Sequence, residues 1–266
     1  MADQYHGFHY DKDGDGIVTV TMDMDGPVNA MNAQFRSALA ETLDRLENES
    51  GLAGVIIASA KPTFFAGGDL KAIVAAEPGQ EAEQFDMVEQ GIKAPLRRLE
   101  KLPVPVVAAI NGAALGGGLE ICLACNHRVA WNSPKVKIGL PEVTLGLLPG
   151  AGGVVRTVHM LGLEKALPIL LEGRQLPSAD AAAAGLVDEL VDDVDALVPA
   201  AKAWIKANPD TATQPWDVKG HRIPGGNIWS PKAQMTLSVA PAMLYKKTRG
   251  LLPAPEKILD VAAQAV

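Results

Sequence analysis

The sequence has few cysteines, few aromatic residues and no long uninterrupted apolar segment. Of its 266 residues only 2 are cysteines, and aromatic residues make up 5%. So few cysteines favour a soluble protein in a reducing compartment, and we expect a cytoplasmic one. The longest apolar stretch, residues 104–119, is interrupted by Pro105, Asn111 and several glycines. This composition excludes a membrane-spanning helix there.

Basic residues are also outnumbered. The chain has 24 Lys and Arg against 31 Asp and Glu, a formal net charge of −7. This balance argues against bulk electrostatic binding of nucleic acid, so we expect no nucleic-acid partner. Residues 1–15 are polar and acidic, with neither the apolar core of a signal peptide nor an Arg-rich amphipathic stretch, so we expect no membrane partner. A hydrophobic content of 48% is enough for the core of one large domain.

Several motifs that would indicate a metal or a nucleotide are incomplete. Residues 11–16 imitate the start of a calcium loop, but Met22 stands where the loop needs a glutamate. Cys122 and Cys125 form a CxxC without a second pair, so buried structural cysteines are a better interpretation than zinc or redox chemistry. The glycine runs match neither a dinucleotide fingerprint nor a Walker A motif. We therefore expect no metal and no separate cofactor.

Apolar periodicity predicts strands that alternate with helices, which indicates an α/β fold. After residue 192 the chain becomes rich in proline and glycine loops and ends in a helix-prone tail. We therefore predict a core over residues 1–195 and a loop-rich, helical C-terminal region over residues 196–266. The predicted strands are 17–22, 54–59, 104–110 and 135–138, and the predicted helices are 32–49, 69–76, 84–102, 117–124, 152–161 and 163–172.

Two glutamates stand beside glycine-rich turns. Glu120 ends the segment Asn111–Glu120, and Glu142 lies in the segment Leu140–Gly153. Both segments are otherwise mostly apolar or glycine, and a carboxylate is costly to bury without a partner. A pair of acids in this setting suggests proton transfer.

Three segments have the character of a small-residue turn followed by the start of a helix: Phe64–Leu70, Asn111–Glu120 and Leu140–Val143. Helix N-termini leave backbone N–H groups unpaired, and such groups stabilise anions. Two of them from different turns could form an oxyanion hole for a carbonyl that becomes an enolate. For each segment alone, tight packing or a helix cap is the simpler interpretation.

Together the three segments resemble the enoyl-CoA hydratase (crotonase) superfamily over roughly residues 14–195. That family typically has an Ala-Gly-x-Asp-Leu/Ile turn, an Asn-Gly-x-Ala-x-Gly-Gly-Gly-x-Glu turn and a Pro-Glu-x-x-x-Gly-x-x-Pro-Gly-x-Gly segment. All three patterns are present. The resemblance implies a crotonase-like ββα spiral core with a C-terminal helical region.

The resemblance also implies a reaction, the hydration of trans-2-enoyl-CoA in fatty-acid β-oxidation. Glu120 would deprotonate the water, Glu142 would protonate Cα as a neutral acid, and the N–H groups of Ala66 and Gly117 would hold the thioester oxygen. CoA would belong to the substrate, so no cofactor is needed. The implied substrate and CoA contacts are Val28, Ala30, Gly68, Asp69, Leu70, Gly116, Pro141 and Leu145, and the alkyl pocket would be lined by Ile73, Val74, Met87, Ile92, Leu145 and Leu148.

The C-terminal region departs from stand-alone hydratases. It resembles the hydratase half of multifunctional fatty-acid oxidation proteins, in which a hydroxyacyl-CoA dehydrogenase follows. We therefore expect an excised N-terminal part, with that dehydrogenase and a thiolase as partners, and the usual homotrimer or hexamer is in doubt. The alternatives are a Δ3-Δ2 enoyl-CoA isomerase, a non-catalytic acyl-CoA- or RNA-binding protein, and a docking module.

Overall fold

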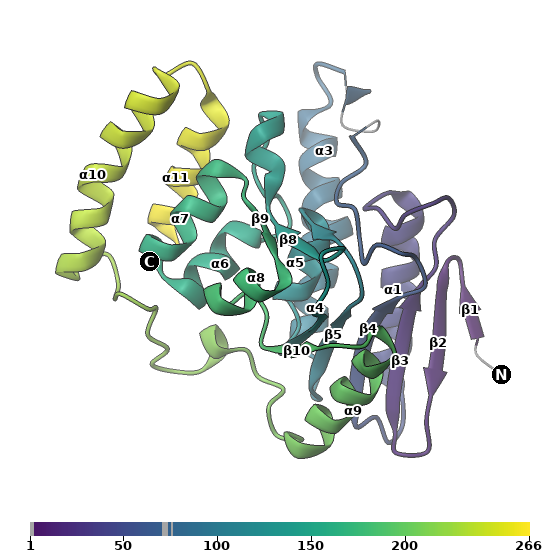
Figure 1. Cartoon of the computed structure of the whole chain (residues 1–266). Helices are drawn as coiled ribbons and strands as arrows, with labels where there is room; N and C mark the ends of the chain where they lie inside the picture. The colour runs from purple at the N-terminus through teal and green to yellow at the C-terminus, as the bar shows by residue number, and fades with distance from the viewer. Residues whose placement is uncertain (1–2, 71–73, 76) are drawn as a thin grey trace.

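The computed structural model describes residues 3–70, 74–75 and 77–266, and its largest element is a mixed seven-stranded sheet (Figure 1). The strand order is β1-β2-β3-β4-β5-β7-β10. The first three strands pair antiparallel, and the strands from β3 to β10 pair parallel. The strands are β1 (Asp3–Tyr5), β2 (Phe8–Lys12), β3 (Ile17–Met22), β4 (Gly54–Ser59), β5 (Val106–Ile110), β7 (His127–Trp131) and β10 (Glu189–Val191).

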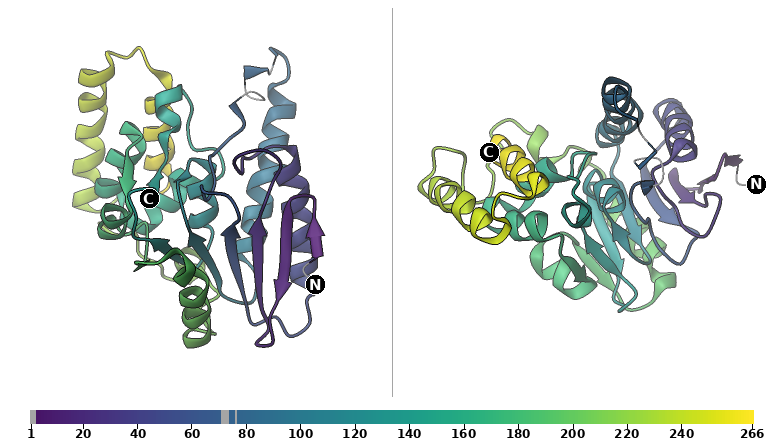
Figure 2. Two further views of the ribbon diagram at one scale, coloured as in Figure 1. Left: turned by 45° about the vertical axis from the view of Figure 1, so that its right-hand side comes forward. Right: turned by 90° about the horizontal axis from the view of Figure 1, so that it is seen from above.

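A second, three-stranded sheet has the order β6-β8-β9, with β6 (Ala114–Leu115), β8 (Lys137–Gly139) and β9 (Gln175–Pro177). The pair α10 and α11 lies at the opposite end of the molecule from the N-terminus (Figure 2). Among the described residues, no helix is both long and apolar enough to cross a membrane. The helices are α1 (Ala33–Asn48), α3 (Glu81–Val88), the π-helix η1 (Glu89–Lys93), α4 (Ala94–Glu100), α5 (Gly117–Leu123), the 3-10 helix η2 (Pro141–Leu145), α6 (Gly153–Leu161), α7 (Leu163–Glu172), α8 (Ser178–Ala184), the 3-10 helix η3 (Val194–Ala196), α9 (Leu197–Ala207), the 3-10 helix η4 (Pro215–Asp217), α10 (Pro231–Thr248) and α11 (Pro253–Gln264).

The regular spacing of apolar residues in α1 explains its position. The side chain of Asn32 accepts a hydrogen bond from the Phe35 N–H at 2.9 Å, which caps the first turn. Phe35, Leu39, Leu43 and Leu46 form one buried stripe along the helix. The helix predicted over residues 32–49 is thus confirmed.

Pro95 is accommodated by a π turn. Proline has no N–H and its ring crowds the carbonyl four residues earlier, so an uninterrupted α-helix through Pro95 would be strained. The Ala94 N–H instead reaches the Glu89 carbonyl, five residues back, and the helix widens over Glu89–Lys93. The helix predicted over residues 84–102 therefore exists as a continuous helical segment, α3-η1-α4, with one π turn.

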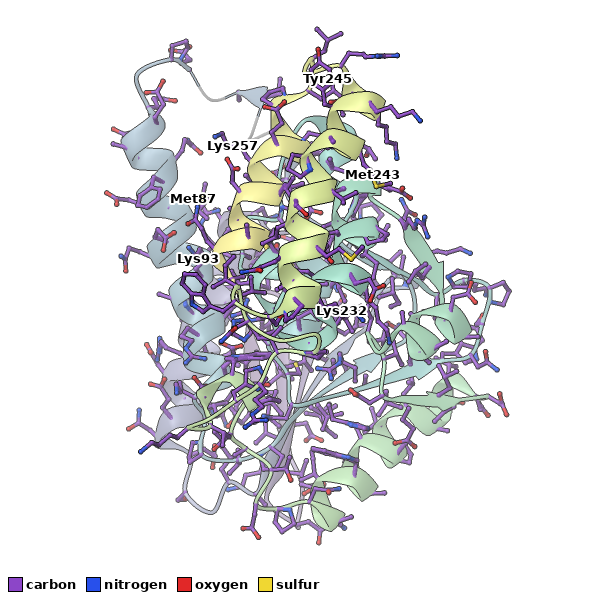
Figure 3. The ribbon with its side chains drawn as sticks, turned by 90° about the vertical axis from the view of Figure 1, so that its left-hand side faces the viewer. Met87, Lys93, Lys232, Met243, Tyr245 and Lys257 are labelled. Carbon is purple, nitrogen blue, oxygen red and sulfur yellow. The ribbon has the colours of Figure 1, made fainter. Side chains whose placement is uncertain are left out.

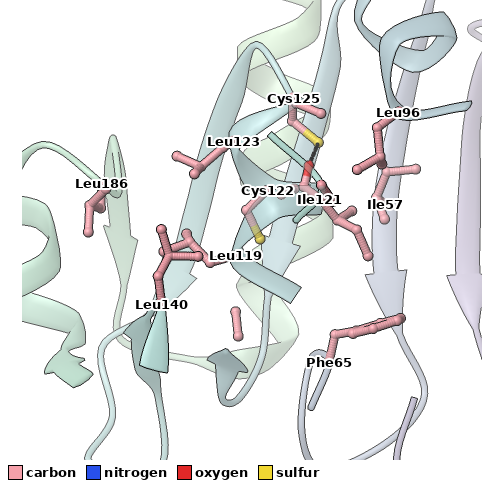
Figure 4. Packing of buried hydrophobic residues seen from close by; sticks show 14 of the residues in the cluster. Ile57, Phe65, Leu96, Leu119, Ile121, Cys122, Leu123, Cys125, Leu140 and Leu186 are labelled. Atoms are coloured by element: carbon pink, nitrogen blue, oxygen red, sulfur yellow. Dashed lines mark hydrogen bonds between the residues drawn. The ribbon is translucent and has the colours of Figure 1, made fainter. Parts of the chain in front are cut away.

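Apolar side chains fill both faces of the large sheet. The larger cluster lies between the sheet and the helices that include α1, α4, α5 and α6, and part of it is seen in Figure 4. The buried thiols Cys122 and Cys125 belong to it, and the Cys125 thiol donates a hydrogen bond to the Ile121 carbonyl at 3.4 Å. Both cysteines are free, as the buried structural interpretation predicts. The second cluster packs α9 against the other face, through Leu197, Ala201 and Ile205.

The other predicted elements agree with the structure to different degrees. The strand predicted over residues 135–138 is β8, which begins two residues later, at Lys137. Of residues 11–16, the first two end β2 and the other four form the turn to β3, where the Asp13 side chain accepts from the N–H groups of Asp15 and Ile17. Half of the helix predicted over residues 69–76, residues 71–73 and 76, falls outside the described residues. The boundary near residue 195 stays a prediction.

Candidate active site

Three loops meet at one edge of the large sheet because each follows the carboxyl end of one of three neighbouring parallel strands, β3, β4 and β5. Backbone hydrogen bonds join these loops. The Met31 N–H donates to the Gly67 carbonyl at 2.9 Å, the Phe65 N–H to the Ala113 carbonyl at 3.0 Å, and the Leu115 N–H to the Phe65 carbonyl at 3.2 Å. Ligands of α/β sheets commonly bind at this edge.

Asn29 holds the first two loops together. Its fully buried side-chain amide donates to the Met22 carbonyl, the Ser59 hydroxyl and the Phe64 carbonyl, and its side-chain oxygen accepts from the Met24 N–H at 3.1 Å. Sequence reasoning did not identify this role, because the partners of Asn29 lie on loops that only the folded sheet brings together.

The loops enclose a cavity of about 340 Å³. Both glutamates, the glycines of two turns and the apolar side chains of α3 and η2 face it. A larger cleft, of about 560 Å³, lies against α6, α7, α8 and the loop near Trp216, away from both glutamates. The cavity is lined by Met31, Arg36, Ala66, Gly67, Gly68, Asp69, Leu70, Gln84, Met87, Val88, Ile92, Gly116, Gly117, Glu120, Pro141, Glu142, Leu145, Leu147, Leu148, Gly150 and Ala151.

Most of the residues expected to contact substrate line this cavity. Those that do so are Gly68, Asp69, Leu70, Gly116, Pro141 and Leu145, together with Met87, Ile92 and Leu148 of the expected alkyl pocket. Figure 3 shows Met87 on α3 and Lys93 on η1. Val28 and Ala30 lie outside the lining, whereas the neighbouring Met31 is part of it. Val74 is 84% exposed and Ile73 falls outside the described residues.

Glu120 projects from the first turn of α5 and is almost completely buried. Its Oε1 accepts hydrogen bonds from the N–H groups of Ala151 (2.7 Å) and Gly153 (2.8 Å). A side chain on Gly153 would come within 2.9 Å of Glu120, so this approach requires glycine. The two donors fix Oε1 and leave Oε2 as the oxygen available to a ligand.

Glu142 stands in the first turn of η2, next to the glycine turn at Gly116. Its Oε2 is buried and has no hydrogen-bond partner within the described part of the chain. Its Oε1 would lie 2.8 Å from a Cβ on Gly116, whose φ of +54° is in the left-handed region. Gly116 is therefore required both for its backbone conformation and for the space that Glu142 occupies.

Burial raises the pKa of both carboxyl groups. Desolvation is the main cause for Glu142, and repulsion from Glu120 adds to it, so that its pKa rises to about 8. Desolvation also raises the pKa of Glu120, but the backbone donors on Gly153 and Ala151 and the charges of Arg156 and Lys93 act in the opposite direction. The groups that stabilise a negative charge are thus gathered around Glu120, and Glu142 is the member of the pair that keeps its proton.

One of the two N–H groups expected to form the oxyanion hole is not free in the structure. The Ala66 N–H donates to the Asn29 carbonyl at 2.9 Å, so it is already engaged. Two residues further on, the Gly68 N–H has no hydrogen-bond partner among the described residues, and the same is true of the Gly117 N–H at the start of α5. Both glycines line the cavity.

The arrangement can therefore move protons and stabilise an anion in one place. A carboxyl group that keeps its proton and a carboxylate held by backbone donors face the same cavity. Gly68 and Gly117, whose N–H groups have no partner among the described residues, line it as well, and an oxyanion hole needs two such donors. Apolar side chains of α3 and η2 cover one side, as an alkyl chain would need.

Comparisons with known proteins identify the family of this chain. The profile of the enoyl-CoA hydratase/isomerase family matches residues 12–214. The fatty acid oxidation complex subunit alpha of Shewanella loihica is 39% identical over 94% of this chain and 35% of its own length. The subunit of the same name from Shewanella halifaxensis is 36% identical over 97% of this chain and 36% of its own length. The chain thus spans about a third of the length of these relatives.

Solved structures show the same fold. An enoyl-CoA hydratase from Bacillus anthracis superposes with a TM-score of 0.68 at 26% identity, covering 98% of this chain and 90% of the other. A second structure, described as an enoyl-CoA hydratase from Geobacillus kaustophilus, gives a TM-score of 0.70 at 25% identity over 79% of this chain and 76% of the other. The expected crotonase-like core with a C-terminal helical region is confirmed.

Proposed function

The chain belongs to the enoyl-CoA hydratase/isomerase family, and we propose that it adds water syn across the double bond of trans-2-enoyl-CoA thioesters to give 3-hydroxyacyl-CoA. The observation that carries this proposal is that the buried Glu120 and the half-buried Glu142 face one cavity. Glu120 has the hydrogen-bond donors that favour a carboxylate, and burial keeps Glu142 protonated. Hydration needs one base and one acid at the same double bond.

In the proposed mechanism, Glu120 takes a proton from water and the oxygen attacks Cβ of the enoyl group. The electrons of the double bond move toward the thioester, whose oxygen becomes enolate-like. The N–H groups of Gly68 and Gly117 donate to that oxygen, and each such donor typically contributes about 3–4 kcal/mol to the transition state. Glu142 then delivers its proton to Cα, and both glutamates exchange protonation states before the next turnover.

The direct test is hydration of crotonyl-CoA and of a longer enoyl-CoA, followed as loss of enoyl-thioester absorbance, with a 3-enoyl-CoA as a parallel substrate for isomerisation. Turnover of the 2-enoyl substrates supports hydration. Isomerisation of the 3-enoyl substrate without hydration would replace this proposal with the isomerase. Binding of acyl-CoA without either reaction would leave a binding role. Hydration, isomerisation and acyl-CoA binding are all measured on one preparation of folded protein.

The pH dependence provides an independent prediction. Hydration requires the protonated form of Glu142, and burial raises the pKa of that carboxyl to about 8. We therefore expect kcat/KM to be high at neutral pH and to fall as pH rises through about 8, tenfold for each further pH unit. Steady-state rates at low substrate concentration between pH 6 and 10 measure this fall. A kcat/KM that stays constant to pH 10 would contradict the assignment of Glu142 as the acid.

The names of the longer relatives suggest a setting for this reaction. Both are subunits of a fatty acid oxidation complex, and this chain corresponds to about a third of each. We propose that the chain is the hydratase part of such a protein and that a hydroxyacyl-CoA dehydrogenase and a thiolase act on its product. Co-purification of these activities with the chain tests the proposal.

A further inference from the structure

A buried ion pair lies directly behind the turn that holds Glu120. Arg156 of α6 donates from Nε to Glu100 Oε1 at 2.7 Å and from Nη2 to Glu100 Oε2 at 3.1 Å. Both residues are at least nine-tenths buried. The remaining Arg156 nitrogen, Nη1, donates to the Ala151 carbonyl at 2.7 Å. Ala151 is the residue whose N–H donates to Glu120, so a single peptide segment separates the ion pair from the proposed base.

Further ion pairs connect Glu100 to the C-terminal region. Glu100 Oε2 also accepts from Arg97 Nη1 at 2.9 Å, and Arg97 in turn binds both oxygens of Asp217 in η4. Lys101 completes this outer cluster at 3.1 Å from Asp217. Because Arg97 remains beside Glu100, the carboxylate keeps a positive partner if Arg156 is neutralised. Variants of Arg156 are therefore less prone to unfolding than those of an isolated buried pair.

We propose that Arg156 and Glu100 are positioning residues for Glu120, fixing the 150–153 turn and setting the charge around the base. The inference rests on the proposed function of Glu120 as the base. Two observations carry it. All three guanidinium nitrogens of Arg156 donate hydrogen bonds, two to the Glu100 carboxylate and one to the Ala151 carbonyl. A side chain on Gly152 would come within 2.3 Å of Arg156 Nη1, so the guanidinium packs directly against the turn.

The pair has two separable effects on Glu120, one geometric and one electrostatic. The fork of the guanidinium fixes the turn, and lysine cannot reproduce it. The positive charge of Arg156 lowers the pKa of Glu120, as does that of Lys93 on η1. A negative charge on Glu100 of α4, which lies behind the same turn, acts in the opposite sense. Glu142 on η2 faces the same cavity but is neutral while it keeps its proton. Neutralising Arg156 must therefore raise the pKa of Glu120, and neutralising Glu100 must lower it.

Three single variants and one double variant separate these effects in the full chain. Arg156→Lys keeps the charge and loses the fork, so kcat should fall roughly 10- to 100-fold. The acidic limb of the pH profile, where activity rises as Glu120 loses its proton, should stay in place. Arg156→Gln should move that limb to higher pH and Glu100→Gln should move it to lower pH. The double variant Glu100→Gln, Arg156→Gln should restore the limb while kcat remains low. KM should change less than threefold or so throughout, because neither residue lines the cavity.

Arg128→Lys is the matched control. Arg128 is 5% exposed, pairs with Asp188 at 2.6 Å and donates to the Cys125 carbonyl at 3.0 Å, so it has the same kinds of partner away from the cavity. We expect lower thermal stability in this variant with kcat and the pH profile unchanged. If Arg156→Lys behaves like Arg128→Lys, the pair is structural and the positioning role is wrong.

A readout that needs no turnover distinguishes failure of this inference from failure of the proposed function. Carboxyl-carbon NMR of protein labelled at glutamate, with the Glu120 signal assigned by Glu120→Gln, follows the titration of that group directly. The titration midpoint should rise in Arg156→Gln and fall in Glu100→Gln. If the variants show these shifts but the wild type hydrates nothing, the positioning pair is supported and the hydratase is rejected. If the wild type is active but the variants have unshifted midpoints, only the positioning pair is rejected.

Discussion

Glu120→Gln and Glu142→Gln are each expected to lower kcat for hydration of crotonyl-CoA by about 10²- to 10⁴-fold, the usual effect of removing one positioned acid or base. Glutamine is nearly isosteric with glutamate, and its oxygen can still accept the two backbone N–H groups that bind Glu120 Oε1. The cavity should therefore keep its shape. Loss of activity would then report the chemistry of the carboxyl group and not a change of fold.

The control for this prediction is Glu164→Gln. Glu164 is largely exposed and pairs with Lys232 near the larger cleft, away from both glutamates. Its variant should have wild-type kcat. Wild-type rates in either Glu120→Gln or Glu142→Gln would reject the assignment of that residue. A Glu142→Gln variant that loses hydration but keeps isomerisation of 3-enoyl-CoA would show that Glu120 alone shuttles protons in the second reaction.

Much of the candidate site could be predicted because its chemically important residues lie in short contiguous motifs. Glu120 and Glu142 each stand next to glycines, and the structure brings both to one cavity. The position of the oxyanion donor could not be read in the same way. Whether the N–H of Ala66 or that of Gly68 is free depends on which one pairs with Asn29, and that pairing is a contact between distant loops. The roles of Arg156 and Glu100 were missed for the same reason.

The fold shows a similar division between local and long-range information. Helices such as α1 were predictable because their apolar stripe and cap lie within one segment. The strands β1, β9 and β10, of three residues each, were not predicted, because their pairings with other strands decide where they form. The π turn before Pro95 is another such case, because proline explains why the helix must adapt but not which helical geometry it adopts.

Glu142→Gln is also expected to stabilise the protein at alkaline pH. The pKa of Glu142 is about 8 in the folded protein and near its ordinary value of 4.5 in the unfolded chain. Between these values the folded state holds a proton that the unfolded state has released, so stability falls as pH rises through this window. The difference of 3.5 pH units corresponds to as much as about 5 kcal/mol at 1.36 kcal/mol per unit. Glutamine does not titrate, and the variant avoids this loss.

Urea unfolding of wild type and Glu142→Gln at pH 5 and pH 9 measures the effect, with Glu164→Gln as the control. The two proteins should have similar unfolding free energies at pH 5, and the variant should be more stable at pH 9. A difference that does not depend on pH would mean that Glu142 is not the source. The result would bear directly on the proposed catalysis, because the burial that favours the protonated form of Glu142 is the same burial that destabilises its charged form. A protein that needs this acid near neutral pH therefore carries a stability cost at alkaline pH that a non-catalytic relative with glutamine at this position would not have.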